Sequence, residues 1–180
     1  MINILVLVGE SASGKSTIEK ELTDTYGFKK IISYTTRPPR ENEIDGVDYH
    51  FISKEKFYEL QMNNFFAEIG CYRNWYYGTA LEDCTNDKVC VLTPHGLRQM
   101  KAIDGLNIKS FYINISRRDR LIKMLQRGDD IDECCRRSLN DQGMFDGIQD
   151  EVDYVIDNDG YKKSAEDIAN EIMIKLLEEE

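Results

Sequence analysis

Long hydrophobic runs and a surplus of basic side chains are both missing from this 180-residue sequence. No stretch approaches the ~20 consecutive apolar residues of a membrane-spanning helix, so we expect no membrane segment. Lysine and arginine number 23 against 33 acidic residues, which gives a net charge of −10. Such a surface repels nucleic acid and anionic lipid, and neither is expected as a partner. A phosphate-binding site must then be a local basic pocket in an acidic protein.

Paired cysteines are also missing. The cysteines are Cys71, Cys84, Cys90, Cys134 and Cys135, an odd number without a C-x-x-C spacing. The sequence therefore predicts neither a disulfide framework nor a zinc site. The vicinal pair Cys134–Cys135 is interpreted as helix packing rather than as a redox site. The N-terminus reads as a core strand and not as a signal peptide, so a cytoplasmic protein with reduced thiols is expected.

What the sequence does contain is a complete phosphate-loop motif. Gly9-Glu10-Ser11-Ala12-Ser13-Gly14-Lys15-Ser16 fits G-x-x-x-x-G-K-[ST] and lies between an apolar run and a helical pattern. Backbone N–H groups of such a loop, together with the helix N-terminus, bind phosphate oxygens. Lys15 is expected to reach the β- and γ-phosphates, and Ser16 to ligate Mg²⁺. The motif predicts that the chain binds a nucleoside triphosphate.

Apolar runs alternate with helical patterns, which predicts an α/β fold with a three-layer core and a parallel sheet. Strands are expected at Ile2–Val8, Lys29–Ser33, Lys88–Leu92, Ile108–Ile115 and Val152–Ile156. Helices are expected at about Lys15–Tyr26, Pro94–Ile103, Arg117–Gln126, Asp132–Met144 and Ser164–Glu178. We interpret the chain as one domain whose core comprises residues 1–33, 81–126 and 150–180.

Two segments interrupt the alternation of strands and helices. Residues 34–80 are rich in aromatic side chains and are expected to form a small α+β insert, with a short helix near Lys54–Gln61. Residues 127–149 are charged and punctuated by glycine, which is typical of a mobile helical lid. These two segments are called the insert and the lid below.

The insert begins with a stiff cationic turn, Ser33-Tyr34-Thr35-Thr36-Arg37-Pro38-Pro39-Arg40. Proline fixes φ, so less freedom is lost when the turn orders around a ligand. The guanidinium groups of Arg37 and Arg40 match phosphate oxygens. Taken alone, the turn is equally consistent with an ordinary surface arginine turn.

Further motifs follow at characteristic spacing. They are E-x-x-G-x-D-Y-x-F over Glu43–Phe51, then Glu68, then Tyr76-Tyr77-Gly78-Thr79. Together with the phosphate loop, this series resembles the guanylate kinases. The resemblance is firm over residues 1–80 and weaker at Leu125–Gly128 and Val155–Asp159. It implies a P-loop NTPase fold and transfer of the γ-phosphoryl group of ATP to GMP with Mg²⁺, which yields ADP and GDP.

The resemblance also implies roles for individual residues. ATP would be bound by Gly9, Ser11, Ser13, Gly14, Lys15, Ser16, Thr17 and Asn158, the last near the adenine. GMP would be bound by Ser33, Arg37, Arg40, Tyr49, Glu68, Tyr77, Gly78, Thr79 and Thr93. Within this set Glu68 would accept hydrogen bonds from N1–H and N2–H₂ of guanine, and Thr79 would donate to O6. The plainer interpretation of Glu68 is an ordinary carboxylate at a strand edge.

The expected catalytic set is Lys15, Arg37, Arg127 and Arg137. Arg127 and Arg137, with Arg136 as a weaker candidate, would close over the triphosphate and exclude water. The alternative is that these arginines pair with Asp129, Asp130, Asp132 and Glu133 on a solvated helix. The acceptor is itself a phosphate anion, so no general base is expected.

Thr93 departs from the family pattern, since an aspartate is expected after the strand Lys88–Leu92. A hydroxyl lacks the charge of a carboxylate, which would leave Mg²⁺ to Ser16, the phosphates and water. Two alternatives therefore stay open. One is a related kinase acting on a sugar phosphate or modified nucleotide, as does a ribose-bisphosphate kinase among the guanylate-kinase-like proteins. The other is a non-catalytic module like the kinase-like domains of scaffold proteins. Monomer and homodimer are both compatible with the sequence.

Overall fold

A five-stranded parallel sheet forms the centre of the structure, a computed structural model that describes residues 2–178. Its strands, in spatial order, are β2 (Lys29–Lys30), β7 (Lys88–Leu92), β1 (Ile2–Val8), β8 (Leu106–Asn114) and β9 (Tyr154–Asp157). Every neighbouring pair in this sheet is parallel. Because β1 lies in the middle, the loop that follows it emerges at the centre of the edge where the strands end. Ligands of open α/β sheets bind at this edge.

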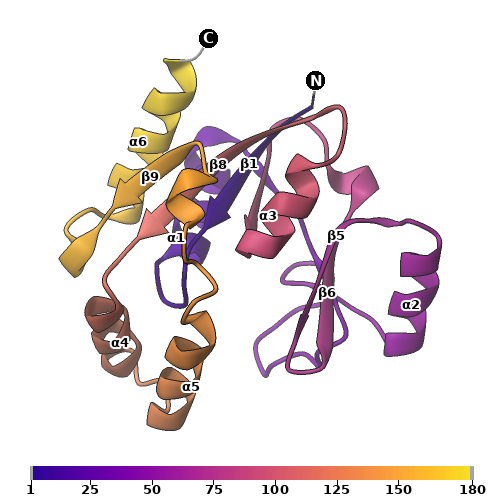
Figure 1. The fold of residues 1–180 in the computed structure, drawn as a ribbon, viewed down its shortest axis with the longest axis horizontal. Coiled ribbons are helices and arrows are strands. Elements are labelled where there is room, and N and C mark those ends of the chain that lie inside the picture. The colour runs from indigo at the N-terminus through magenta and orange to yellow at the C-terminus, as the bar shows by residue number, and fades with distance from the viewer. Residues whose placement is uncertain (1, 179–180) are drawn as a thin grey trace.

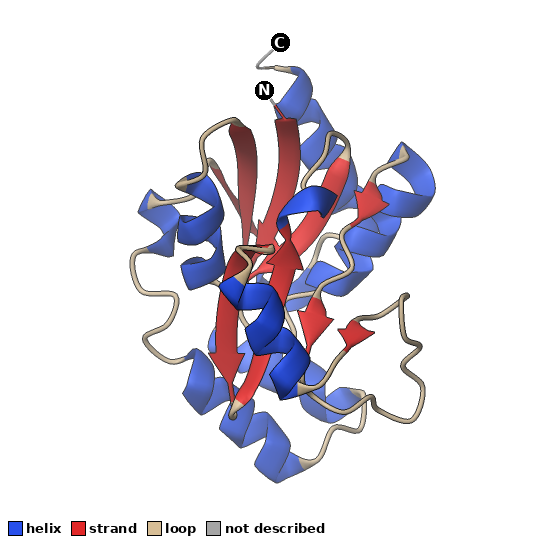
Figure 2. Cartoon of the chain, turned by 90° about the vertical axis from the view of Figure 1, so that its right-hand side faces the viewer, coloured by secondary structure: helices blue, strands red, loops and turns tan. Residues whose placement is uncertain are grey.

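Helices cover both faces of the sheet, as Figure 2 shows. On one face Val6 and Val8 pack with Leu97 and Met100 of α3 (Pro94–Lys101). On the other face the buried side chains come from β1, from α1 (Lys15–Tyr26) and from α6 (Ala165–Leu177), and they are Leu5, Leu7, Ile18, Leu22, Ile168 and Ile172. The expected α/β core with a parallel sheet is confirmed.

A second sheet lies to one side of this core (Figure 1). Its strands, in spatial order, are β4 (His50–Phe51), β3 (Tyr34–Thr35), β6 (Trp75–Ala80) and β5 (Phe66–Tyr72). Helix α2 (Lys54–Met62) packs on it through Phe57, which is fully buried. The Phe57 ring stacks on Phe66 at 4.6 Å and on Tyr76 at 5.4 Å between ring centroids. The aromatic side chains of the insert thus build a small core of their own.

Helices α4 (Arg117–Gln126) and α5 (Ile131–Asp141) lie together at the opposite side from this second sheet (Figure 1). Helix α5 ends at Asp141 and not at the expected Met144, because Gln142 is extended and Gly143 has a φ of 78°. The expected strand Lys29–Ser33 is also shorter, because the chain leaves the core sheet and pairs with β6 from Tyr34 onward. Three short 3-10 helices complete the structure: η1 (Leu81–Asp83), η2 (Ile148–Asp150) and η3 (Asp159–Tyr161).

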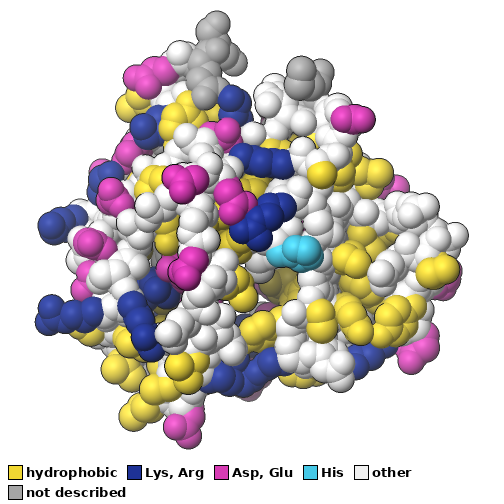
Figure 3. Space-filling model, in the orientation of Figure 1, with side chains coloured by type: hydrophobic (Ala, Val, Ile, Leu, Met, Phe, Trp, Pro, Cys, Tyr) yellow, Lys and Arg dark blue, Asp and Glu magenta, His cyan; other side chains and the backbone are white. Residues whose placement is uncertain are grey.

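The surface carries charges of both signs. On the face drawn in Figure 3, acidic and basic side chains are interspersed and form no large patch of one sign. Between residues 2 and 178, the structure contains no helix with the length and apolar character needed to cross a membrane.

One carboxylate is buried against the core without strong compensation. Glu19 of α1 is 7% exposed, and its Oε2 atom lies 3.7 Å from Lys30 Nζ. Burial raises the pKa of Glu19 to about 7, more than the nearby ammonium lowers it. The folded protein therefore binds this proton more tightly than the unfolded chain does. The resulting stabilisation is complete below pH ~4.5 and is lost as the pH rises through 7.

Glu19→Gln should remove this pH dependence. Relative to the wild type, the variant should gain unfolding free energy between pH 5 and pH 8, by at most about 3 kcal/mol. Urea unfolding at the two pH values measures the difference. Exposed Glu41 offers the matched control, since Glu41→Gln should change the unfolding free energy equally at pH 5 and at pH 8. Equal changes for the two variants would contradict the assignment.

Candidate active site

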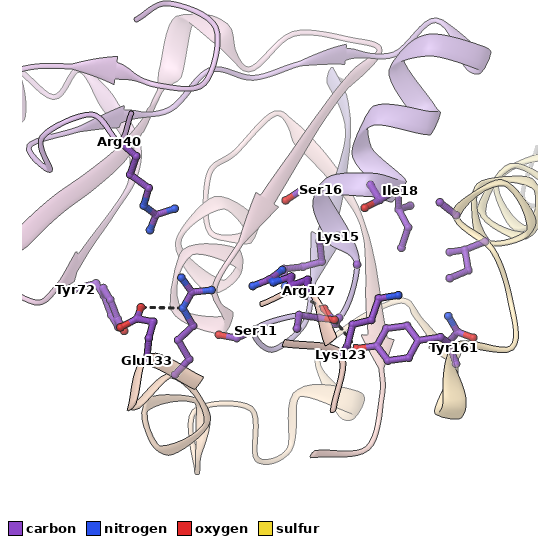
Figure 4. A pocket seen from close by; sticks show the side chains of 18 of the residues that line it. Ser11, Lys15, Ser16, Ile18, Arg40, Tyr72, Lys123, Arg127, Glu133 and Tyr161 are labelled. Carbon is purple, nitrogen blue, oxygen red and sulfur yellow. Dashed lines mark hydrogen bonds and ion pairs between the residues drawn. The ribbon is translucent and has the colours of Figure 1, made fainter. Parts of the chain in front are cut away.

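A cavity of about 640 Å³ lies where the phosphate loop, the insert and the lid meet. Its wall includes residues 11–18, six insert residues and three lid arginines. The insert residues include Arg37, Arg40 and Tyr77, and the lid arginines are Arg127, Arg136 and Arg137. Figure 4 shows Arg40, Lys15 and Arg127 reaching toward the same space. The lining is rich in cations although the protein as a whole is acidic, as the sequence predicts for a phosphate site.

The phosphate loop depends on two glycines. Gly14 has a φ of 89° at the start of α1, a left-handed conformation that other residues rarely adopt. At Gly9, a β-carbon would lie 2.6 Å from Ser13 Oγ and 3.0 Å from the Ile113 carbonyl oxygen. The loop can therefore bend tightly against β8 only because Gly9 has no side chain.

Lys15 lies at the floor of the cavity and is folded back on its own loop. Its Nζ donates to the Glu10 carbonyl oxygen at 2.8 Å and to Ser13 Oγ at 3.0 Å. The pKa of Lys15 is lowered to about 8 because burial disfavours the charged form. The negative charges of Asp141 and Glu10 partly offset this effect of burial. A further negative group, such as a triphosphate, would raise the pKa of this side chain again.

Sequence reasoning missed a buried ionic network beneath the loop. Arg120 of α4 donates to Glu10 Oε1 at 3.2 Å, and its Nη1 lies 3.5 Å from Asp141 Oδ2 at the end of α5. The same Asp141 oxygen accepts from the Ser11 amide at 2.8 Å. The Tyr112 hydroxyl donates to Glu10 Oε2 at 2.9 Å. Glu10 occupies a variable position of the loop motif, so no pattern in the sequence points to this network.

On the acceptor side, Arg37 is buried and already paired. Its Nη2 donates to Glu43 Oε1 at 2.8 Å, and its guanidinium lies 5.5 Å from the centroid of the Tyr49 ring. Glu43 Oε2 accepts from the Arg40 amide at 2.8 Å, so one carboxylate holds both ends of the Pro-Pro turn. The centroids of the Tyr49 and Tyr77 rings lie 6.1 Å apart. The structure thus brings together most of the predicted acceptor-phosphate residues.

Ser33 belongs to a neighbouring group with Glu68 and Thr79. The Thr79 hydroxyl donates to Glu68 Oε1 at 2.7 Å and lies 3.4 Å from Ser33 Oγ. Glu68 is 8% exposed, and burial raises its pKa. A β-carbon on Gly96, in the first turn of α3, would lie 2.9 Å from Glu68 Oε2. Gly96 therefore makes room for the carboxylate, a contact that sequence reasoning missed.

Some predicted residues lie beside the cavity and do not line it. They are Gly9, Ser33, Tyr49, Glu68, Gly78, Thr79 and Thr93. Gly78 is packed against the insert core, since a β-carbon there would lie 2.8 Å from the Phe66 ring. Thr93 is the N-cap of α3, and its hydroxyl accepts from the Gly96 amide at 3.2 Å. The structure thus gives Thr93 a local role that needs no ligand.

The lid arginines line the cavity and pair with lid carboxylates at the same time. Arg127 Nε donates to Asp129 Oδ1 at 2.7 Å, and Arg137 Nε donates to Glu133 Oε1 at 2.9 Å. Arg136 forms two hydrogen bonds with Glu133. Asp130 instead caps α5 by accepting from the Glu133 amide at 3.0 Å. The geometry therefore combines both interpretations of these arginines, which are paired and still face the cavity.

At the other end of the cavity, Asn158 holds its own loop. Its side-chain amide bonds the Lys163 carbonyl oxygen at 3.1 Å and the Lys163 amide at 2.8 Å. The Tyr161 hydroxyl donates to the Ala12 carbonyl oxygen at 2.7 Å, and Lys123 Nζ lies 5.1 Å from the Tyr161 ring centroid. The loop thereby docks on the phosphate loop (Figure 4). Tyr161 and Lys123 were missed because no motif marks them.

A protein-only metal centre is not formed by the part of the chain that the structure describes. Within residues 2–178, no three His, Cys, Asp or Glu side chains are grouped to hold an ion. The exposed Ser16 at the cavity wall offers one hydroxyl oxygen, a ligand type that suits Mg²⁺. The donor set fits a magnesium ion that is bound mainly by phosphate oxygens and water.

Comparisons with known proteins identify the family of this chain. The family model described as guanylate kinase matches residues 1–175. The guanylate kinase of Nitratidesulfovibrio vulgaris is 35% identical over 143 residues, which cover 76% of this chain and 69% of that protein. That of Helicobacter hepaticus is 34% identical over 165 residues, covering 87% of this chain and 82% of the relative.

A solved structure shares the fold. The crystal structure of guanylate kinase from Anaplasma phagocytophilum superposes with a TM-score of 0.71 at 22% sequence identity. The match covers 99% of this chain and 86% of that one. Fold, phosphate loop, acceptor turn and family model point the same way, and this chain belongs to the guanylate kinase family.

Proposed function

We propose that this chain is an ATP-dependent nucleoside monophosphate kinase that phosphorylates GMP, with ADP and GDP as products. The observation that carries the proposal is the shared cavity. Its wall combines a complete phosphate loop with the Arg37–Arg40 turn and the lid arginines. A donor triphosphate and an acceptor phosphate would meet in this space.

For the donor, we assign the triphosphate to the amides of the phosphate loop and to Lys15. The loop amides and the N-terminus of α1 favour anions, and Lys15 adds a mobile charge. Thr17, in the first turn of α1, lies on the same wall. We place the adenine near the loop of Asn158 and Tyr161, where Asn158 acts by ordering the backbone.

For the acceptor, Arg37 and Arg40 would hold the phosphate together with Tyr49, Tyr77 and Ser33. Arg37 is buried against Glu43, while the side chain of Arg40 is 67% exposed and lies 3.8 Å from the same carboxylate. Glu68 would then read the base. Guanine presents two adjacent donors to this carboxylate, whereas adenine presents an acceptor at N1, which would leave a buried charge unpaired.

Phosphoryl transfer needs positioning and charge neutralisation more than covalent help. The acceptor phosphate is largely deprotonated near pH 7, so no side chain has to remove a proton. Arg127 and Arg137 would stabilise the charge on the transferred group and exclude water when the lid closes. Ser16 would hold Mg²⁺, which would supply positive charge to neutralise the triphosphate. The cytoplasmic location and the choice between monomer and homodimer stay predictions.

A substrate panel tests the proposal directly. A coupled assay with ATP and Mg²⁺ should show turnover of GMP above that of dGMP, AMP, UMP and CMP. Lys15→Ala should abolish it and serves as the control for contaminating kinases. Preferred turnover of a sugar phosphate would support the alternative acceptor, and absent ATP binding would support a non-catalytic module.

Glu68→Gln should lower guanine selectivity. The carboxamide turns an –NH₂ group toward one guanine donor, so kcat/KM for GMP should fall by about 100-fold, with a smaller change for AMP. The measurement is the ratio of kcat/KM values for the two nucleotides. Glu59→Gln, on the exposed face of α2, should leave the ratio unchanged. A wild-type ratio in Glu68→Gln would exclude this residue from base recognition.

The affinity for ATP should depend on pH through Lys15. With a pKa of about 8 in the free protein, Lys15 must take up a proton to pair with the triphosphate once the pH exceeds 8. The affinity should therefore fall above pH 8, by up to about tenfold per pH unit. Calorimetry with MgATP between pH 7 and 9.5 measures this slope. Lys15→Ala should bind more weakly and show a flatter profile, and equal slopes would contradict the assignment.

A further inference from the structure

The hairpin between β5 and β6 reaches across the cavity. Tyr72 pairs with Trp75, and the two residues between them, Arg73 and Asn74, have φ values of 52° and 62°. Two successive left-handed residues make a tight hairpin turn that follows the twist of the strands. The turn brings Tyr72, Arg73 and Trp75 to the cavity wall.

The tip of this hairpin contacts the lid. The Tyr72 hydroxyl accepts from Asn140 Nδ2 at 2.6 Å and also from Arg136 Nη1. The guanidinium of Arg136 lies 5.7 Å from the centroid of the Tyr72 ring. Next to this pair, Arg73 Nη2 lies 3.6 Å from Glu133 Oε2. Figure 4 shows Tyr72 and Glu133 together at one end of the cavity.

The contact joins two segments that carry different parts of the site. Strand β6 continues from the hairpin to Tyr77 and Thr79, which belong to the acceptor set. Helix α5 carries Arg136 together with Arg137, which belongs to the expected catalytic set and would close over the triphosphate. Glu133 holds one edge of the Arg136 guanidinium, and the Tyr72 hydroxyl accepts from Arg136 and from Asn140, so two side chains of α5 are tied to one residue of the insert.

We propose that Tyr72 is a positioning residue that couples acceptor binding to closure of the lid. The inference rests on the proposed function, because it requires that the insert and the lid bind different nucleotides. Binding of the acceptor orders the hairpin, and the ordered hairpin holds α5 over the donor. By thermodynamic reciprocity, each nucleotide then raises the affinity for the other by the same factor. Tyr72 itself touches neither reacting phosphate.

The test measures that factor. The affinity for a non-hydrolysable ATP analogue is determined by calorimetry with and without saturating GMP, in the wild type and in Tyr72→Phe and Tyr72→Ala. Tyr72→Phe removes only the hydroxyl. It should reduce the coupling factor by about five- to twentyfold and leave the affinity for GMP alone within about twofold of the wild type. Tyr72→Ala also removes the ring and should reduce the factor further.

Tyr58→Phe is the matched control. Its hydroxyl donates a hydrogen bond to the Tyr76 hydroxyl at 2.7 Å, within the insert and on the side of α2, and not to the lid. This variant should keep the wild-type coupling factor. Trp75 is the only tryptophan and lines the cavity beside Tyr72, so its emission gives a second readout. The change in emission on adding the analogue to the GMP complex should shrink in both Tyr72 variants.

The outcomes separate this inference from the proposed function. If the substrate panel identifies another acceptor, GMP is replaced by that acceptor and the same cycle is measured. The proposed function then fails while the coupling by Tyr72 is still tested. Wild-type coupling in both Tyr72 variants, or an equal loss in Tyr58→Phe, overturns the inference.

Discussion

The turn between Val8 and Lys15 is the constraint on which the rest of the structure depends. It connects the central strand of the sheet to α1 with no room for a β-carbon at Gly9 and with a left-handed Gly14. Such a turn is tolerated because β1 is fixed on both sides by β7 and β8 and is buried on both faces. The lid and the loop of Tyr161 both hydrogen-bond to this turn, through Ser11 and Ala12. Its position therefore sets the position of the whole donor side.

Three arginines at the cavity wall are each paired with a carboxylate. Arg37 pairs with Glu43, Arg127 with Asp129, and Arg136 with Glu133. In a protein with a net charge of −10, these carboxylates keep a group of arginines at one place without ligand. In the proposed function, a phosphate that replaced one of these carboxylates would keep the number of charged hydrogen bonds nearly constant. Such a site would give selectivity for anions at a moderate gain in affinity.

Much of the fold was predictable from local patterns. The strands β1 and β7 and the helices α1 and α4 have the expected bounds, because apolar runs and helical periodicity are strong signals there. The sequence also showed the phosphate loop and the acceptor turn, since both depend on short motifs. Distances between remote segments carry no such signal. The pairing of Arg120 with Glu10 and the contact of Tyr72 with Arg136 join residues 110 and 64 positions apart. Helix α5 was predicted too long because the helical pattern was extended past Gln142 and Gly143, where the backbone leaves the helix.

The space left by Gly96 has a consequence for the design of altered base preference. The carboxylate of Glu68 fits against the first turn of α3 only because that turn has no side chain at this position. A β-carbon at position 96 would meet the end of the Glu68 side chain, so the carboxylate would have to move. Under the proposed role of Glu68, a substitution at position 96 would therefore alter base preference from a core helix, outside the segment that carries the acceptor motifs.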